Sequence, residues 1–422
     1  MITLAPQPKE RAILIALAFG EDTKEQVEEH LDELELLTDT AGAITVFKVM
    51  QERYRPDPAF YIGKGKAEEI AQLIELNDIQ LVIFDDDLNP TQVRNLEKLF
   101  ERKILDRSGL ILDIFASHAK TREAKTQVEL AQLQYMLPRL TRAWTHLSKQ
   151  YGGIGTKGPG ETQIETDRRA IRTRISKLKE NLRKIESQHT TKSASRKDFL
   201  TATLVGYTNA GKSTLLNRLT SSDVLAEDKL FATLDSTTRS FELSKGKTIL
   251  LSDTVGFIRK LPHNLVASFK TTLNVVRDAD IIIHVIDVTH DFYEDHIRVV
   301  EETLNELDAQ KKTQIKVFNK VDALNDRNRL DLVMSNHPES IMVSAERGIN
   351  IGNLKKFLTE IYEKHFSEVE VEIPNNESKK IAKLYELADV TSIKYLDDKA
   401  QIKYRASFSN QQKIKRLISE AS

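Results

Sequence analysis

The stretch of sequence that decides the fold is Gly206-Tyr207-Thr208-Asn209-Ala210-Gly211-Lys212-Ser213. It follows an apolar strand candidate over residues 201–205 and opens a helix candidate over 212–219, the context that a G-x-x-x-x-G-K-[ST] phosphate loop requires. The glycines allow backbone N–H groups to approach phosphate oxygens, and the helix N-terminus adds the positive end of its dipole. We expect Lys212 to reach the β- and γ-phosphates and the Ser213 hydroxyl to bind Mg²⁺. A plain Gly-rich turn is the structural alternative, and the flanking elements favour the phosphate loop.

A second motif, Asp253-Thr254-Val255-Gly256, ends a strand predicted over residues 247–252. It places a carboxylate near Mg²⁺ and the backbone N–H of Gly256 near the γ-phosphate. We expect a γ-phosphate sensor between these two motifs, and the best candidate is Phe231-Ala232-Thr233-Leu234-Asp235. Thr233 would offer its hydroxyl to Mg²⁺, although Thr237 and Thr238 compete on spacing alone. Lys212, Thr233 and Gly256 would then act together on the charge of the transferring phosphoryl group.

Two further motifs predict that the base of the bound nucleotide is guanine. They are Asn319-Lys320-Val321-Asp322, after a strand predicted over 314–318, and Ser344-Ala345, after one over 340–343. A carboxylate in the first can accept from N1–H and the 2-amino group of guanine, a donor pair that adenine lacks. The Ala345 N–H can meet guanine O6. Asp and Asn often end strands in turns, so one such motif proves little. Four such motifs, each at the end of a predicted strand and in this order, predict a site for GTP or GDP with Mg²⁺.

The residue after the second motif is Phe257, where many small GTPases have a glutamine that orients the attacking water. A phenylalanine cannot form a hydrogen bond to that water. We therefore hypothesise that intrinsic hydrolysis is slow and that a partner supplies or orders the missing group. The alternative is that another side chain or the backbone positions the water unaided.

Composition narrows the class of protein. The chain has 422 residues, no cysteine and 40% hydrophobic residues, which is enough for several soluble cores and excludes disulfides and thiolate metal sites. No apolar run approaches the roughly 18–20 residues of a membrane span, and residues 11–19 lack a following small-residue cleavage site. We expect a cytoplasmic, monomeric protein without stable membrane insertion.

Charge is uneven along the chain. The net charge is −1, yet residues 116–200 hold 18 Lys and Arg against 8 Asp and Glu, a surplus of ten positive charges. A basic segment in an otherwise acidic chain suggests a polyanionic partner such as nucleic acid. A solvated helical surface explains the charge alone equally well.

The same segment carries two heptad-like patterns that predict an antiparallel helical hairpin. The apolar positions of the first arm are Leu133, Leu137, Leu140, Trp144 and Leu147, and those of the second are Ile164, Ile171, Ile175, Leu178, Leu182 and Ile185. Pro138 is a candidate kink in the first arm. A Gly-rich tip over 151–160 joins the arms, and Thr162-x-x-Glu165 predicts a capping box for the second. The second arm presents Arg168, Arg169, Arg172, Arg174, Lys177, Lys179, Arg183 and Lys184.

The fold class that these patterns predict is a multidomain α/β protein. Alternating strands and helices over residues 1–115 indicate a mainly parallel α/β domain, followed by the hairpin over 116–197. A P-loop G domain with a mostly parallel sheet is expected over 198–366, and a small α+β domain over 367–422.

Together the nucleotide motifs, from Gly206–Ser213 to Asn319–Asp322, resemble those of the HflX family of ribosome-associated GTPases. The most specific elements are Gly158-Pro-Gly-Glu-Thr-Gln-Ile-Glu-Thr-Asp-Arg-Arg169 and Tyr61-Ile-Gly-Lys-Gly65. The resemblance spans the chain. One departure is Ser344-Ala345-Glu346, where GTPases more often have Lys in the third place; the backbone contact to guanine is unaffected.

The resemblance implies a GTP hydrolase that is stimulated by ribosomes and binds the 50S subunit with its ribosomal RNA. It further implies that the hairpin tip points toward the peptidyl-transferase region and that the GTP form splits stalled or idle 70S ribosomes. Phe257 would be the family's hydrophobic substitution for the catalytic glutamine. The alternative is a ribosome- or RNA-binding module that uses GTP as a conformational switch with incidental turnover. A membrane-linked regulator is a weaker third possibility, which no apolar anchor supports.

Overall fold

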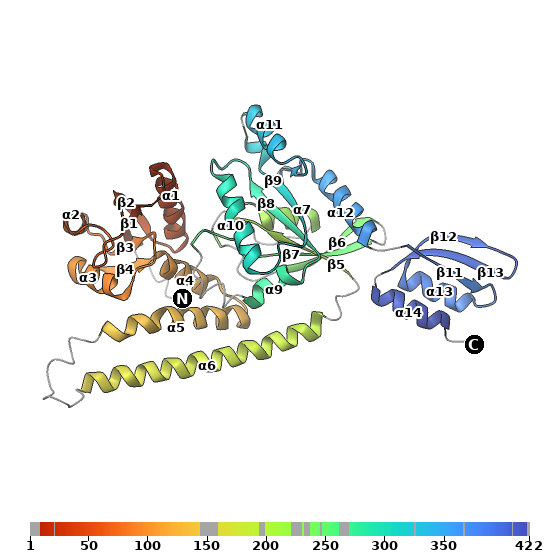
Figure 1. Ribbon diagram of the computed structural model, residues 1–422, viewed down its shortest axis with the longest axis horizontal. Helices are drawn as coiled ribbons and strands as arrows, with labels where there is room; N and C mark the ends of the chain where they lie inside the picture. The colour runs from red at the N-terminus through yellow and green to blue at the C-terminus, as the bar shows by residue number, and fades with distance from the viewer. Residues whose placement is uncertain are drawn as a thin grey trace, which may run out of the picture. The chain divides into compact units, whose positions relative to one another are not determined.

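The computed structural model describes residues 9–20, 22–143, 159–193, 199–220, 230–231, 237–244, 247–260, 270–324, 326–365, 368–406 and 408–419. Its described residues contain three sheets (Figure 1). The chain divides into two compact units, each of which is described by itself. The first comprises Met1–Lys184, Glu227–Asp235 and Ile258–Thr272, and the second comprises Ile185–Ala226, Ser236–Phe257 and Leu273–Ser422.

The first unit is built on a parallel four-stranded sheet with the order β2-β1-β3-β4. Its strands are β1 (Arg11–Ala18), β2 (Ile44–Glu52), β3 (Leu81–Phe84) and β4 (Lys103–Asp106). β3 is buried along its whole length and β1 is buried after its first residue, as continuous apolar runs in a parallel sheet require. This sheet confirms the parallel α/β fold expected of the N-terminal segment.

The helices of this sheet are α1 (Lys24–Thr40), α2 (Lys64–Leu76), α3 (Pro90–Phe100) and α4 (Arg107–His118). All but α2 begin at a residue whose side chain accepts a hydrogen bond from an N–H group of the first turn. Thr23 and Asn89 each form a capping box, and Asp106 accepts from the Gly109 N–H. The sequence did not predict α4, because it follows β4 without a loop and buries most of its surface rather than one stripe. α4 extends across residue 115, where the first segment was expected to end.

The helical hairpin consists of α5 (Arg122–Ala143) and α6 (Pro159–Ser193), which run antiparallel side by side (Figure 1). Arg174 Nε of α6 lies 2.6 Å from Glu129 Oε1 of α5. Pro138 lies inside α5. Because α6 begins at Pro159, Thr162 lies within the helix, and its prediction as a cap was wrong. Residues 144–158, which include Trp144, Leu147 and most of the Gly-rich tip, lie outside the described residues.

The second unit contains the six-stranded sheet, with the order β10-β9-β8-β5-β7-β6. Its strands are β5 (Leu200–Val205), β6 (Thr237–Ser244), β7 (Lys247–Asp253), β8 (Ile281–Asp287), β9 (Thr313–Asn319) and β10 (Ile341–Met342). Only β6 pairs antiparallel within this sheet, and the other pairs are parallel. The mostly parallel sheet of the predicted P-loop domain is therefore confirmed.

The helices that follow the parallel strands return the chain to the end of the sheet where the strands begin. The carboxyl ends of β5, β7 and β9 therefore all lie at the opposite end of the sheet. These helices are α7 (Lys212–Thr220), α9 (Lys270–Asp278), α10 (Tyr293–Glu306), α11 (Arg327–Asn336) and α12 (Ile351–His365), with a short 3₁₀ helix at Val321–Ala323. Leu204, Leu216, Ile283 and Val317 belong to the buried core of this sheet.

The chain ends in a three-stranded antiparallel sheet with the order β11-β13-β12. Its elements are β11 (Glu368–Pro374), α13 (Ser378–Leu387), β12 (Asp389–Tyr395), β13 (Lys399–Arg405) and α14 (Phe408–Ser419). Ile373, Leu384, Ile402 and Ile414 pack in its core, which matches the predicted α+β tail. Among the described residues, no helix is both long enough and apolar enough to span a membrane.

Candidate guanine-nucleotide site

The predicted phosphate loop lies between β5 and α7, and two of its glycines are required by close backbone packing. A Cβ on Gly206 would lie 2.2 Å from the Val285 carbonyl oxygen, and one on Gly211, where φ is +87°, would lie 2.3 Å from Asn319 Nδ2. Neither position has room for a side chain, so the loop can follow this path only with glycine. Thr203 to Val205 of β5 are buried ahead of it, which anchors the loop to the core.

Lys212 occupies the first position of α7 with a buried side chain. Its Nζ donates hydrogen bonds to the carbonyl oxygens of Gly206 at 3.1 Å and Tyr207 at 2.7 Å. Burial lowers the pKa of Lys212 to about 8, against the opposing effect of Asp253. The ammonium group is thus folded onto its own loop, and an incoming phosphate would offer it a stronger, charged acceptor.

Ser213 and Asp253 lie side by side and fit a Mg²⁺ site. The Ser213 hydroxyl donates to Asp253 Oδ2 at 2.6 Å, while Asp253 Oδ1 accepts from the Thr254 N–H at 2.9 Å. Asp253 is fully buried. A hydroxyl and a carboxylate are oxygen donors of the kind that Mg²⁺ prefers. Thr233, the other predicted Mg²⁺ ligand, lies outside the described residues with Ala232, Leu234 and Asp235.

The Asp253–Gly256 motif is held beside the phosphate loop by backbone hydrogen bonds of the next residue, Phe257. The N–H of Phe257 donates to the Gly206 carbonyl at 3.0 Å, and the N–H of Thr208 donates to the Phe257 carbonyl at 2.8 Å. Gly256 is therefore held against the loop, where a Cβ would lie 2.8 Å from Thr208 Cα. The Phe257 side chain is buried, so this position contributes packing and no polar group. Thr254 and Val255 are also buried, and the Thr254 hydroxyl donates to the Leu204 carbonyl.

The predicted base-binding motifs meet through Asn319 at the end of β9. Its Nδ2 donates to the Ala210 carbonyl and its Oδ1 accepts from the Ala345 N–H, both at 2.9 Å. One buried amide therefore ties the phosphate loop to the Ser344-Ala345 segment. Ser344 is fully buried, and its Oγ accepts from the Arg347 N–H. Lys320 has a left-handed backbone, and its Nζ lies 2.7 Å from Asp287 Oδ2. Asn209 is also left-handed, with φ at +58°.

Two arginines at this end of the site were not predicted from the sequence. Arg218 of α7 donates from Nε to the Ala345 carbonyl at 2.9 Å and also bonds the Glu346 carbonyl. Arg347 Nε lies 3.2 Å from Asp322 Oδ2, so an arginine holds the carboxylate expected to bind guanine. Neither contact has a local sequence signal, because Arg218 lies 127 residues before Ala345.

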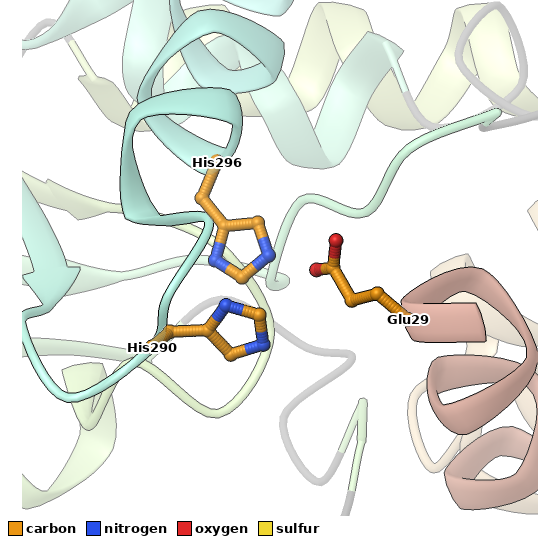
Figure 2. Close-up of side chains that lie close together, drawn as sticks. All are labelled: Glu29, His290 and His296. Atoms are coloured by element: carbon orange, nitrogen blue, oxygen red, sulfur yellow. The ribbon is translucent and has the colours of Figure 1, made fainter. Parts of the chain in front are cut away.

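An aromatic stack beside the phosphate loop was also missed. The ring of Tyr207 lies parallel to that of His296, with centroids 3.8 Å apart and an interplanar angle of 6°. His290 lies at a tilt to His296, with ring centroids 4.3 Å apart. Figure 2 shows His290 just ahead of α10 and His296 within its first turns. The stack holds the second position of the phosphate loop against α10.

Residues adjacent to the nucleotide motifs form part of the first unit. Phe231, the first residue of the predicted sensor, is buried with φ at +57° and packs edge-on against Phe115 of α4 at a centroid distance of 4.6 Å. Arg259 and Lys260, which follow Phe257 closely in the chain, form ion pairs with Asp85 at the end of β3. Sequence patterns gave no sign of these long-range contacts.

A phosphate loop, an adjoining Ser–Asp pair and two base-recognition motifs joined by Asn319 define a P-loop guanine-nucleotide-binding protein. Comparisons with known proteins narrow the class. Residues 28–116 match the GTP-binding GTPase N-terminal family, 118–196 match the GTP-binding GTPase middle region and 201–320 match the 50S ribosome-binding GTPase family.

Curated relatives extend the likeness over most of the chain. The GTPase HflX of Flavobacterium psychrophilum is 51% identical over 314 residues, covering 74% of this chain and 76% of that protein. The GTPase HflX of Escherichia coli is 44% identical over 381 residues, covering 90% and 89%, and that of Magnetococcus marinus is 44% identical over 395 residues, covering 93% and 91%. The chain belongs to the HflX family of GTPases, and it hydrolyses GTP.

Proposed function

We propose that this GTPase binds the large ribosomal subunit and, in its GTP form, splits stalled or idle 70S ribosomes. The observation that carries the proposal is the basic surface of α6. Most of its predicted phosphate-facing side chains are exposed along one long helix: Arg169, Arg172, Arg174, Lys177, Lys179, Arg183 and Lys184. Such a row can neutralise successive phosphates of an RNA backbone.

The match of residues 201–320 to a family described as ribosome-binding supports the ribosome as the source of that RNA. We infer that the protein acts as a monomer in the cytoplasm, where ribosomes are located. We also retain the division into an α/β domain over 1–115, a hairpin over 116–197, a G domain over 198–366 and an α+β domain over 367–422.

The proposed roles of the site residues follow from their contacts. Ser213 and Asp253 would hold Mg²⁺ together with Thr233, and Mg²⁺ supplies charge neutralisation on the β- and γ-phosphates. Lys212 would move from the Gly206 and Tyr207 carbonyls to the phosphates, and the Gly256 N–H would meet the γ-phosphate. Asp322 would release Arg347 to accept from guanine, and the Ala345 N–H would meet guanine O6.

The test measures GTP turnover with and without purified 50S subunits at two salt concentrations. We expect strong stimulation that weakens at high salt, because phosphate contacts release counterions. Tight GTP binding without stimulation would contradict the ribosomal proposal. Binding to 50S subunits without stimulated turnover would support the alternative, a ribosome-binding module that uses GTP as a switch.

Charge-reversal variants locate the contact. Changing Arg172, Lys179 and Arg183 of α6 together to Glu is expected to remove the stimulation while leaving GTP binding unchanged. The matched control changes Lys379, Lys383 and Lys415 to Glu, which alters the net charge equally at exposed positions of α13 and α14. Equal losses in both variants would point to net charge rather than to α6.

The tip of the hairpin has a separate test. Deleting residues 152–160 is expected to preserve GTP binding and to abolish 70S splitting, measured by light scattering. Unchanged splitting would leave the tip as a connecting turn only.

A further inference from the structure

Thr208, the third residue of the phosphate loop, carries a buried hydroxyl that the nucleotide motifs do not account for. The residue is 7% exposed, and its Oγ1 has no hydrogen-bond partner in the part of the chain that the structure describes. A buried hydroxyl without a partner destabilises the fold. A threonine with this unsatisfied group therefore indicates a polar partner that arrives with the ligand.

The surroundings of Thr208 indicate which part of the nucleotide would supply that polar partner. A Cβ built on Gly256 would lie 2.8 Å from both Cα and Cγ2 of Thr208 and 3.1 Å from Lys212 Nζ. Thr208, Gly256 and the Lys212 ammonium group therefore converge on one point. Lys212 and the Gly256 N–H are the groups expected at the γ-phosphate, so the Thr208 side chain, whose Cγ2 faces Gly256, lies beside the expected position of the γ-phosphate.

The position of Thr208 is well determined by its backbone and its shape. Its N–H donates to the Phe257 carbonyl at 2.8 Å, and the Phe257 N–H donates to the Gly206 carbonyl. Threonine is branched at Cβ, which restricts χ1 and thus the direction of the hydroxyl. A preorganised hydroxyl needs little reorganisation during the reaction.

We propose that Thr208 is a catalytic residue whose hydroxyl orients the attacking water, the task that the buried Phe257 cannot perform. A hydroxyl can accept one hydrogen bond and donate another. It accepts from the water and donates to an oxygen of the γ-phosphoryl group. The water oxygen forms a bond to the γ-phosphorus, and the bond from that phosphorus to the β–γ bridging oxygen breaks. GDP leaves with the electron pair, and the proton of the water passes to the released phosphate.

The experiment compares Thr208→Val, which keeps the shape and removes the hydroxyl, with Thr208→Ser, which keeps the hydroxyl. Single-turnover hydrolysis of γ-labelled GTP by the full chain without any partner is measured beside the affinities for GTP and GDP. We expect at least a tenfold slower hydrolytic step in Thr208→Val, affinities within about twofold, and a rate within about threefold of the unaltered protein in Thr208→Ser.

The control is Thr203→Val in β5, where the hydroxyl already donates to the Val275 carbonyl at 3.2 Å. It removes a buried threonine hydroxyl away from the reacting groups and is expected to leave the hydrolytic step unchanged. Thr208→Ala serves in place of Thr208→Val if the latter does not fold.

Binding of aluminium fluoride together with GDP is a second measurement, because aluminium fluoride imitates the transferring phosphoryl group. A residue with a merely structural role would not affect formation of this complex. Thr208→Val should lose this complex while it retains GDP, and Thr208→Ser should keep both. Hydrolysis by Thr208→Val at the rate of the unaltered protein would overturn the proposal. A weaker GTP affinity with an unchanged hydrolytic step at saturating GTP would overturn it too, because the hydroxyl would then bind the ground state and the transition state equally.

Discussion

Arg259 Nη2 lies 3.2 Å from both carboxylate oxygens of Asp85, a residue 174 positions earlier in the chain. Arg107 Nη1 and Lys260 Nζ also lie within 2.9 Å of this carboxylate, and Asp85 is nearly inaccessible to solvent. Burial alone would raise the pKa of Asp85, but the charges of Arg107, Arg259 and Lys260 outweigh it and hold the pKa below its usual range.

Asp85→Asn is expected to destabilise the first unit by about 3 kcal/mol, because removing one partner leaves buried positive charge uncompensated. The stabilisation from a carboxyl whose pKa is depressed is present above its unfolded-state pKa and is lost as pH falls below about 4. Denaturant unfolding between pH 3 and pH 7 measures both effects, and the variant should show a flatter pH profile. Asp32→Asn is the control, since Asp32 pairs with Lys48 at an exposed site. Equal unfolding midpoints for the two variants would contradict the prediction that Asp85 stabilises the first unit.

Lys212 predicts a pH dependence of nucleotide affinity. With a pKa of about 8 in the free protein, the ammonium group loses its proton as pH rises above 8, whereas phosphate binding requires the charged form. GDP affinity should therefore fall by up to tenfold per pH unit above pH 8, and binding there should take up protons from the buffer. Calorimetry in buffers of different ionisation enthalpy measures this uptake. Lys212→Ala should bind weakly with no such dependence, and a flat affinity up to pH 10 in the unaltered protein would refute the prediction.

Arg347 is expected to compete with guanine for Asp322. Its side chain is 69% exposed, so the ion pair is weak. Arg347→Ala should increase GDP affinity by less than about fivefold and reduce the salt dependence of association, measured by stopped-flow fluorescence. Arg298→Ala is a matched control, because Arg298 is also 69% exposed and pairs with Asp295 at 3.1 Å. A lower GDP affinity in Arg347→Ala would show that the arginine assists binding instead.

Asn319 joins the phosphate loop to the Ser344-Ala345 segment through two hydrogen bonds. Asn319→Ala should lower GDP affinity by roughly tenfold to a hundredfold, because the buried Ala210 carbonyl and Ala345 N–H both lose their partner. Equilibrium titration with a fluorescent GDP analogue measures the loss. Asn328→Ala, at an exposed position of α11, should leave the affinity unchanged. An affinity within twofold in Asn319→Ala would mean that the two loops hold their positions independently.

Local patterns in the sequence were sufficient for the elements that bear the nucleotide motifs. The phosphate loop could be predicted because its glycines, lysine and serine are consecutive and its flanks have strand and helix patterns. Asp253 and Asn319 each end an apolar strand, and parallel strands bring their carboxyl ends to one edge. α4 was not predicted from the sequence, because a helix that is buried on nearly all sides has no amphipathic period.

The sequence by itself determined the class of ligand, since recognition of phosphate and guanine uses short runs of adjacent residues. Only the tertiary structure decided which side chains hold those runs in place. Arg218 reaches Ala345, Arg347 pairs with Asp322, and His296 stacks on Tyr207, all across long separations that leave no local pattern. The orphaned hydroxyl of Thr208 is likewise a property of packing, because whether a polar group has a partner depends on which distant segments surround it.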